Sequence, residues 1–462
     1  MTHAGGAASA GQPLVSCHTG AAARLGAVVR EELRRWAGHL APKQVVIKPN
    51  WVMHEFDPAY PIAALVTDAR LIVETVRATF EMFPSVERVT VGDCLEQRAD
   101  WPLLCAQSGL SAWIAPLEAE FAGRLAFRDL RSIVFRQVGD DLVEDALAPH
   151  GDPAGYCEVQ LQGESHLEPI ADQAEKFSIH DHDTSMTRSR HRLGDHRYLV
   201  CQSVLDADLV INLPKWKAHS KSGLTGALKN LVGINGDKSY LPHFRRGSPR
   251  WGGDEYSDEG RWLYWVQNNL YQLVRGTVAL DLLRPGWKVV KRVNNAVRRR
   301  STTRSMPADF YVVGGSWYGN QTVWRMIYDL NLVLQRADRH GRLQPSPQRA
   351  TVTLVDGIVS GEGDGPLKAL PRETNMLFAG SDPFAIDATL AWMMGFDPDA
   401  ILMVAKRHEF LGRDWGTFAL KDLMITVDGT SQRLVDTAIN FSFLPAPGWI
   451  GHVERVKSAR RA

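Results

Sequence analysis

A short stretch in the middle of the chain, residues 212–220 (NLPKWKAHS), gathers side chains that could bind an anion and move a proton. Lysine ammonium groups suit phosphate or carboxylate groups, and a histidine changes its charge near neutral pH. The apolar run 207–213 predicts a buried strand, which Pro214 ends because proline cannot donate a hydrogen bond to a ladder. Ligands of α/β proteins bind outside the carboxyl ends of strands, so we expect this exit loop to line a site. The alternative is a solvated loop that is merely basic.

The same stretch leads into a predicted helix start. Thr225 and Gly226 open an amphipathic segment that also carries Lys229 and Asn230. Helix N-termini favour anions because their first amides have no partner within the helix. We therefore expect the ammonium groups and the helix amides to hold one anionic group together.

An earlier predicted strand ends with polar side chains of the same kind. Residues 45–50 (VVIKPN) close on lysine, proline and asparagine. Because parallel strands end at one edge of a sheet, we expect both sets of side chains to meet there. The expected ligand-binding residues are Lys48, Asn50, Asn212, Lys215, Thr225, Gly226, Lys229 and Asn230.

Carboxylates also lie at the ends of predicted strands. Asp356 follows the strand predicted over 351–355, and the glycine-dense segment 360–366, a predicted tight turn close to a ligand, carries two more. Such carboxylates suit a hard cation such as Mg²⁺ or act as bases, so we expect His219, Lys217 and Asp356 to be catalytic. The predicted metal ligands are Asp93, Glu362, Asp364 and Asp382. A purely structural turn is the alternative for the glycine-dense segment.

The elements around these residues predict an α/β fold. A strand over 45–50, a helix over 69–80 capped by Thr67 or Asp68, and a strand over 86–91 form a parallel βαβ unit. We expect a mostly parallel twisted sheet flanked by helices, with helical and loop insertions. The predicted parts are a partly disordered lead-in with a first helix (1–42), the α/β core (43–395) with insertions near 124–196 and 240–305, and a C-terminal extension packed on the core (396–462).

Composition narrows the class of protein. The chain has 462 residues and a net charge of +1, so its overall charge favours neither nucleic acid nor membrane. Its five cysteines form no CxxC pair, and we expect no iron–sulfur cluster. A scattered cysteine set suits a reducing compartment, and the chain shows neither a secretory signal nor an apolar span of about 18 residues. We therefore expect a cytoplasmic protein without a transmembrane segment.

Two other segments allow a functional interpretation beside an ordinary one. Residues 180–183 (HDHD) suggest a metal site, although a polar surface loop is favoured because four adjacent residues converge only in a special turn. The basic segment 284–304 is either a solvated amphipathic arm, which is favoured, or an arm that docks an acidic partner or a membrane surface. Because nucleic-acid binding would depend on this run alone, we do not expect it.

Known catalytic motifs do not define a reaction. The chain contains no GxSxG, HExxH or Walker A sequence, and the glycines of GEGDG (361–365) do not form GxGxxG.

Four segments in order along the chain resemble the domain of unknown function 362 family. They are VVIKPN (45–50), INLPKWKAHSKSGLTGALKNLVG (211–233), VDGIVSGEGDGP (355–366) and AGSDPFAIDA (379–388). The resemblance implies no reaction, because the biochemistry of that family is largely undefined. Many relatives carry ferredoxin-type cysteine runs, which this chain lacks.

Three functions follow as hypotheses. The first is an enzyme that acts on a small anionic metabolite, bearing phosphate or carboxylate, with a divalent cation such as Mg²⁺. The second is a non-catalytic protein that binds such a ligand. The third is a redox protein like the cluster-bearing relatives.

Overall fold

The computed structural model describes residues 12–138, 141–145, 150–179, 184–258 and 314–455. Several expectations lie outside these residues. They are the disordered lead-in up to residue 11, the HDHD segment (180–183) and the basic segment 284–304.

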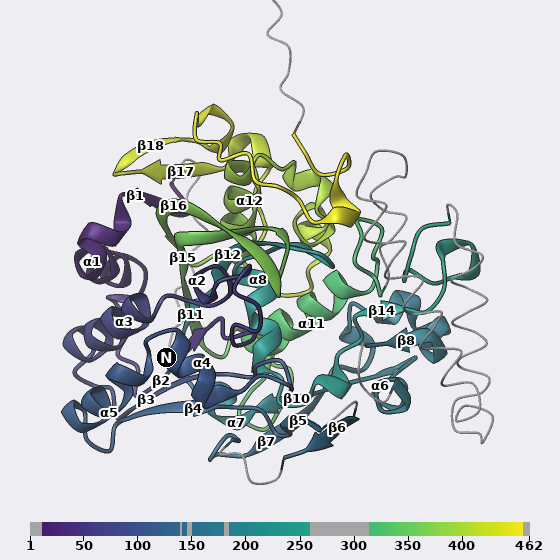
Figure 1. Ribbon diagram of the computed structural model, residues 1–462, viewed down its shortest axis with the longest axis horizontal. Helices are drawn as coiled ribbons and strands as arrows, with labels where there is room; N and C mark the ends of the chain where they lie inside the picture. The colour runs from purple at the N-terminus through teal and green to yellow at the C-terminus, as the bar shows by residue number, and fades with distance from the viewer. Residues whose placement is uncertain (1–11, 139–140, 146–149, 180–183, 259–313, 456–462) are drawn as a thin grey trace, which may run out of the picture.

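One large sheet organises the described residues (Figure 1). Eleven strands of the described chain belong to it, in the order β18-β17-β1-β16-β15-β11-β2-β3-β4, with β12 paired to β15 and β13 paired to β12. Their bounds are β1 Val15–Thr19, β2 Gln44–Pro49, β3 Arg88–Asp93, β4 Leu125–Asp129, β11 Leu209–Leu213, β12 Lys215–His219, β13 Gly223–Thr225, β15 Ala350–Asp364, β16 Lys368–Gly380, β17 Met424–Val427 and β18 Thr430–Arg433.

The sheet has a parallel half and a mixed half. Strands β4, β3, β2, β11 and β15 run parallel to one another, so their carboxyl ends meet at one edge. Strand β16 is antiparallel to both β15 and β1, whereas β17 is parallel to β1. The prediction of an α/β fold with a mostly parallel sheet is confirmed.

Helices cover both faces of the sheet (Figure 1). Helices α1 (Leu25–Ala37) and α3 (Ala69–Met82) pack on one face, and α8 (Ala227–Asn230), α11 (Val323–Arg336) and α12 (Pro383–Met394) pack on the other. Side chains of a strand alternate between the two faces. Leu209 and Ile211 of β11 therefore join the core around α1 and α3, whereas Val210 joins the core around α11 and α12. The apolar run predicted as a buried strand is continuous because both of its faces are covered.

Local signals explain the main helices. Asp68 caps α3 by accepting a hydrogen bond from the amide of Arg70, as the sequence predicts. Asp382 caps α12 in the same way, with Pro383 in the first turn. Helix α12 is apolar on all sides, which suits its buried position between the sheet and α8.

Shorter elements surround this core. They are α2 Ile62–Leu65, α4 Trp101–Gln107, α5 Ser111–Glu120, β5 Phe135–Val138, β6 Asp141–Glu144, β7 Tyr156–Gln160, β8 Phe177–Ser178, α6 Thr184–Arg190, β9 His191–Arg192, β10 Asp195–Cys201, α7 Gln202–Leu205, β14 Phe244–Arg245 and α13 Leu402–Ala405. No helix among the described residues has the length and apolar character needed to cross a bilayer.

The structure corrects two predicted loops. The lysine- and histidine-rich exit loop is mostly strand, since β12 runs beside β15 and turns back as β13. The glycine-dense segment 360–366, expected to be a tight turn, continues β15 through Asp364 and pairs with β16. Gly361 allows this close packing, because a Cβ there would lie 2.8 Å from the Cβ of Lys217.

Segments outside the predicted core also enter the sheet. Strand β1, from the predicted lead-in, lies between β16 and β17, and the predicted C-terminal extension supplies β17 and β18. Strand β4, within a predicted insertion, forms the opposite edge. These pairings join segments far apart in the sequence, which local patterns do not reveal.

Candidate functional site

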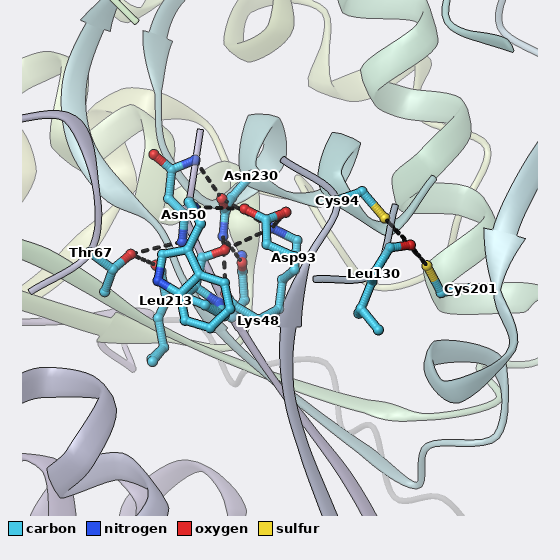
Figure 2. A network of polar contacts seen from close by, with 12 residues as sticks. Lys48, Asn50, Thr67, Asp93, Cys94, Leu130, Cys201, Leu213 and Asn230 are labelled. Carbon is cyan, nitrogen blue, oxygen red and sulfur yellow. Dashed lines mark hydrogen bonds and ion pairs between the residues drawn. The ribbon is translucent and has the colours of Figure 1, made fainter. Parts of the chain in front are cut away.

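Polar side chains from several strand ends meet in one network (Figure 2). The Nζ atom of Lys48 on β2 lies 2.8 Å from Oδ1 of Asp93 on β3. Asn230 of α8 donates to Oδ1 of Asn212 on β11 at 2.7 Å, and Asn50 donates to Oδ1 of Asn230 at 3.0 Å. The structure thus brings together four predicted ligand-binding residues and one predicted metal ligand.

The chain itself satisfies most of this network. The Thr67 hydroxyl donates to the carbonyl of Leu213 at 2.7 Å and accepts from the amide of Asn50 at 2.8 Å. A Cβ at Gly233 would lie 2.0 Å from Oδ1 of Asp93, so only glycine fits against the ion pair. Burial lowers the pKa of Lys48, and the charge of Asp93 opposes that shift.

A second lysine is paired in the same way. Nζ of Lys215 lies 2.8 Å from Oδ2 of Asp356, and both side chains are at most 1% exposed. The carboxylate of Asp356 also accepts from the amide of Asp68 at 2.7 Å and from the amide of Ile358 at 3.0 Å. Both oxygens of this predicted catalytic base are therefore engaged within the protein.

The helix start that was predicted to bind an anion binds a carboxylate side chain of the protein, that of Asp387. The amides of Ala227 and Leu228 donate to the two carboxylate oxygens of Asp387, at 2.6 and 3.2 Å. A Cβ at Gly226 would lie 2.1 Å from Oδ1 of Asp387. Burial raises the pKa of Asp387 to about 7. In the sequence, the only sign of this role is that Asp387 is a carboxylate within the otherwise apolar helix α12.

One face of β12 presents a basic side chain at every second position. Because side chains alternate along a strand, Lys215, Lys217 and His219 lie on one face. Nζ of Lys217 donates to the carbonyl of Leu65 at 2.5 Å, and no carboxylate of the described residues contacts it. Burial lowers the pKa of Lys217 well below its usual value, and repulsion by Lys215 and Lys229 lowers it further.

Two histidines near this face have complementary hydrogen-bonding roles. Nδ1 of His219 accepts from the amide of Lys221 at 3.1 Å, so the neutral ring carries its proton on Nε2. Nδ1 of His243 lies 2.9 Å from the carbonyl of Leu241, to which it donates, and its Nε2 is therefore an acceptor. Burial lowers the pKa of both rings well below the usual value, and the charge of Lys229 is the next cause.

Lys229 is half-buried, and its ammonium group contacts no carboxylate or hydrogen-bond acceptor of the described residues. Burial and then the charges of neighbouring lysines, Lys238 first, lower its pKa to about 7. Lys238 donates to the carbonyl of Cys94 at 2.7 Å, and Lys221 donates to the carbonyl of Gly314. These six groups form what we call the cationic cluster: Lys217, His219, Lys221, Lys229, Lys238 and His243.

The predicted metal ligands do not meet. Asp93 pairs with Lys48, whereas Asp382 accepts from the amide of Gly416 at 2.8 Å and caps α12. They separate because β16, which leads to Asp382, runs antiparallel to β15. Burial raises the pKa of Asp382 to about 6.

The other two carboxylates lie on the distal part of β15. Oε2 of Glu362 accepts from the amide of Leu444 at 3.1 Å, and Asp364 is the last residue of the strand. Across the ranges that the structure describes, no three His, Cys, Asp or Glu side chains lie close enough to hold a metal ion. A divalent cation stays a prediction.

Two cysteines that lie far apart in the sequence form a close pair that their spacing did not predict. The sulfur atoms of Cys94 and Cys201 lie 3.4 Å apart, and both can donate to the carbonyl of Leu130 (Figure 2). Burial, followed by the contact with Cys94, raises the pKa of Cys201 well above the usual range. Cys94 also follows Asp93 directly, so the thiol pair adjoins the strand-end network.

Comparisons with known proteins give one family model, one curated relative over a short stretch and one distant solved structure. A family model described as a domain of unknown function (DUF362) matches residues 163–392. A thylakoid-associated protein of Synechocystis sp. is 33% identical over 75 residues, which cover 16% of this chain and 23% of that protein. A crystal structure of a Thermotoga maritima protein aligns over 76% of this chain and 54% of its own, with 10% identity and a TM-score of 0.34.

Proposed function

The chain belongs to the family of domain of unknown function 362, and from its cationic cluster we propose that it is an enzyme acting on a small metabolite with a phosphate or carboxylate group. The single observation that carries the proposal is a contrast among buried lysines. Lys48 and Lys215 each have a carboxylate partner at 2.8 Å, whereas no described carboxylate contacts Lys217 or Lys229.

Electrostatics favours a ligand of negative charge at the cationic cluster. Like charges that lie close together in a protein repel one another more strongly than they do in water. The depressed pKa values of Lys217 and Lys229 express this repulsion together with burial. An anion bound among these groups would replace repulsion with attraction and would raise both pKa values again.

Unused hydrogen-bonding capacity supports the same proposal. Thr225 lies opposite Lys217 in the β12–β13 ladder, and its buried hydroxyl has no hydrogen-bond partner among the described residues. The Oδ1 atom of Asn50 is also buried without a hydrogen-bond partner among the described residues. Buried polar atoms of folded proteins are rarely left unpaired, so these atoms suit a polar ligand.

The neutral histidines support catalysis rather than binding alone. His219 offers an Nε2–H donor, which suits an anionic oxygen, while Nε2 of the neutral His243 is an unprotonated acceptor. We assign Asp356 to holding Lys215 in place, because its oxygens are already occupied.

Calorimetric titration of the protein with inorganic phosphate, pyrophosphate and citrate at low ionic strength tests the proposal. We expect at least one anion to bind. Lys217→Met and Lys229→Met should each weaken binding by about 10- to 100-fold, because a charge-assisted hydrogen bond contributes about 1.5–3 kcal/mol. The matched control is Lys421→Met, which removes an exposed lysine without a charged partner among the described residues.

Two outcomes would contradict the proposal. One is an absence of binding by all three anions. The other is an equal loss of affinity in Lys421→Met and Lys229→Met, which would indicate general charge attraction. Because Lys217 is fully buried, the half-buried Lys229 provides the second variant if Lys217→Met does not fold.

A further inference from the structure

Helix α8 is held in place by an unusual amount of buried polar bonding for four residues. Asp387 binds its first two amides, Asn212 donates to the carbonyl of Ala227 at 2.9 Å, and Asn331 donates to the carbonyl of Leu228 at 3.1 Å. The three side chains that bind it are at most 1% exposed. Buried and fully bonded partners fix the position of what they hold.

The residue that this arrangement positions is Lys229. Its backbone lies within α8, and the side chain of the next residue, Asn230, is tied to Asn50 and Asn212. Yet the ammonium group of Lys229 itself has no partner among the described residues, and its side chain remains half-buried rather than sealed. The structure therefore presents a half-buried lysine with a fixed backbone, whose amine has no bonding partner among the described residues and lies near other cations.

We propose that the Lys229 amine forms an imine with the carbonyl group of an anionic ligand, an aldehyde or ketone that also bears a carboxylate or a phosphate. This inference rests on the proposed function and names the ligand's reacting group. The neighbouring cations would hold the ligand's charge while its carbonyl carbon meets the amine.

Chemistry supports this role for the amine. Only a neutral amine is a nucleophile, and lysines become neutral near pH 7 when they are desolvated or lie beside another cation. Lys229 meets both conditions, and its pKa is lowered to about 7. The charged and titratable groups that act on it or are affected by it are Lys48, Asp93, Lys217, His219, Lys221, Lys238 and His243.

The step balances without an oxidant or a reductant. The Nζ lone pair forms a bond to the carbonyl carbon, and the carbonyl oxygen leaves as water with the two hydrogens of the amine. Once protonated, the resulting C=N group withdraws electrons from the adjacent carbon of the ligand. His243 has an acceptor nitrogen for the proton released there, and the charge of a bound anion would raise its lowered pKa.

Reductive trapping tests the proposal on the full chain. The protein is incubated at pH 7 with glyoxylate, glyceraldehyde 3-phosphate or neutral acetaldehyde, reduced with cyanoborohydride, digested and mapped by mass spectrometry. We expect one or both anionic aldehydes to label Lys229 at least about ten-fold more than Lys421, which is exposed and lies outside the cationic cluster. Acetaldehyde should show no such preference, and excess inorganic phosphate should protect Lys229.

The comparison between glyoxylate and the phosphorylated aldehyde identifies which anionic group the ligand carries. Lys229→Arg is the matched variant, because it keeps the charge and removes the nucleophile. We expect this variant to lose the preferential label at position 229.

Failure of this inference is separable from failure of the proposed function. Phosphate binding without preferential labelling of Lys229 would overturn the imine and leave the anion site intact. Equal labelling of Lys229 by acetaldehyde and the anionic aldehydes would also overturn it. A protein that binds none of the anions would remove both proposals.

Discussion

Two pairs of lysines near the carboxyl edge of the sheet differ in whether a carboxylate contacts them. Lys48 and Lys215 lie in contact with Asp93 and Asp356, and all four side chains are almost fully buried. Lys217, two positions along β12, and Lys229 on α8 have no carboxylate partner among the described residues. The chain can supply buried counter-charges, so Lys48 and Lys215 serve the fold, and the proposed function assigns Lys217 and Lys229 to a ligand.

Removing the counter-charge of a paired lysine should have the largest effect on stability. Asp356→Asn leaves Lys215 buried without a counter-charge, and such a loss costs about 3–5 kcal/mol. Urea unfolding at pH 7 measures the difference in the free energy of unfolding. The exposed pair Lys43–Glu87 gives a control, since Glu87→Gln should cost less than about 1 kcal/mol.

The matching change at an unpaired lysine sharpens the contrast. Lys217→Met keeps the apolar stem and breaks no ion pair, so its free energy of unfolding should stay within about 1 kcal/mol of the wild type. A loss as large as that of Asp356→Asn would mean that Lys217 is also structural, and the comparison would fail.

An intermediate effect is expected at the start of α8, where the carboxylate of Asp387 binds the helix amides. Gly226→Ala places a Cβ 2.1 Å from Oδ1 of Asp387 and should cost about 1–3 kcal/mol, as overpacked sites do. Gly163→Ala is the control, because nothing lies within 4 Å of its Cβ. Equal unfolding midpoints for the two variants would show that Asp387 does not occupy the α8 amides tightly.

A further prediction concerns the pH dependence of stability. A lysine whose folded pKa is lowered binds fewer protons in the folded than in the unfolded state, so stability rises with pH between the two values. For Lys229 this window runs from about 7 to about 10.4. The ligand-free wild type should therefore gain stability across it, and Lys229→Met should gain less. Parallel stability–pH curves for the two proteins would contradict the assigned pKa.

The sequence predicted which residues lie together at the strand ends, because the end of each strand can be recognised from adjacent residues. An apolar run closing on lysine, proline and asparagine fixes the direction of a strand and the place of its last side chains. With parallel strands, Lys48 and Asn212 then lie side by side, which the structure shows.

Long-range pairing was the part that local patterns could not show. The lysine-rich segment looked like a loop because Pro214 interrupts it, yet β15 provides a ladder on which β12 continues. The carboxylate of Asp387 reaches α8 from a helix more than 150 positions away, and the thiols of Cys94 and Cys201 come together from separate strand ends. No spacing rule connects such residues.

The position of β1 has a consequence for how the protein is made. Val15 pairs with Gly380 on one side and with Ile425 on the other. Strand β1 therefore pairs only after β16 and β17 have been synthesised. At a synthesis rate of about 5–20 residues per second, the nascent chain exposes this strand for on the order of tens of seconds before its neighbours leave the ribosome. The parallel half can therefore assemble before the mixed half, which closes only after β16 and β17 have been synthesised.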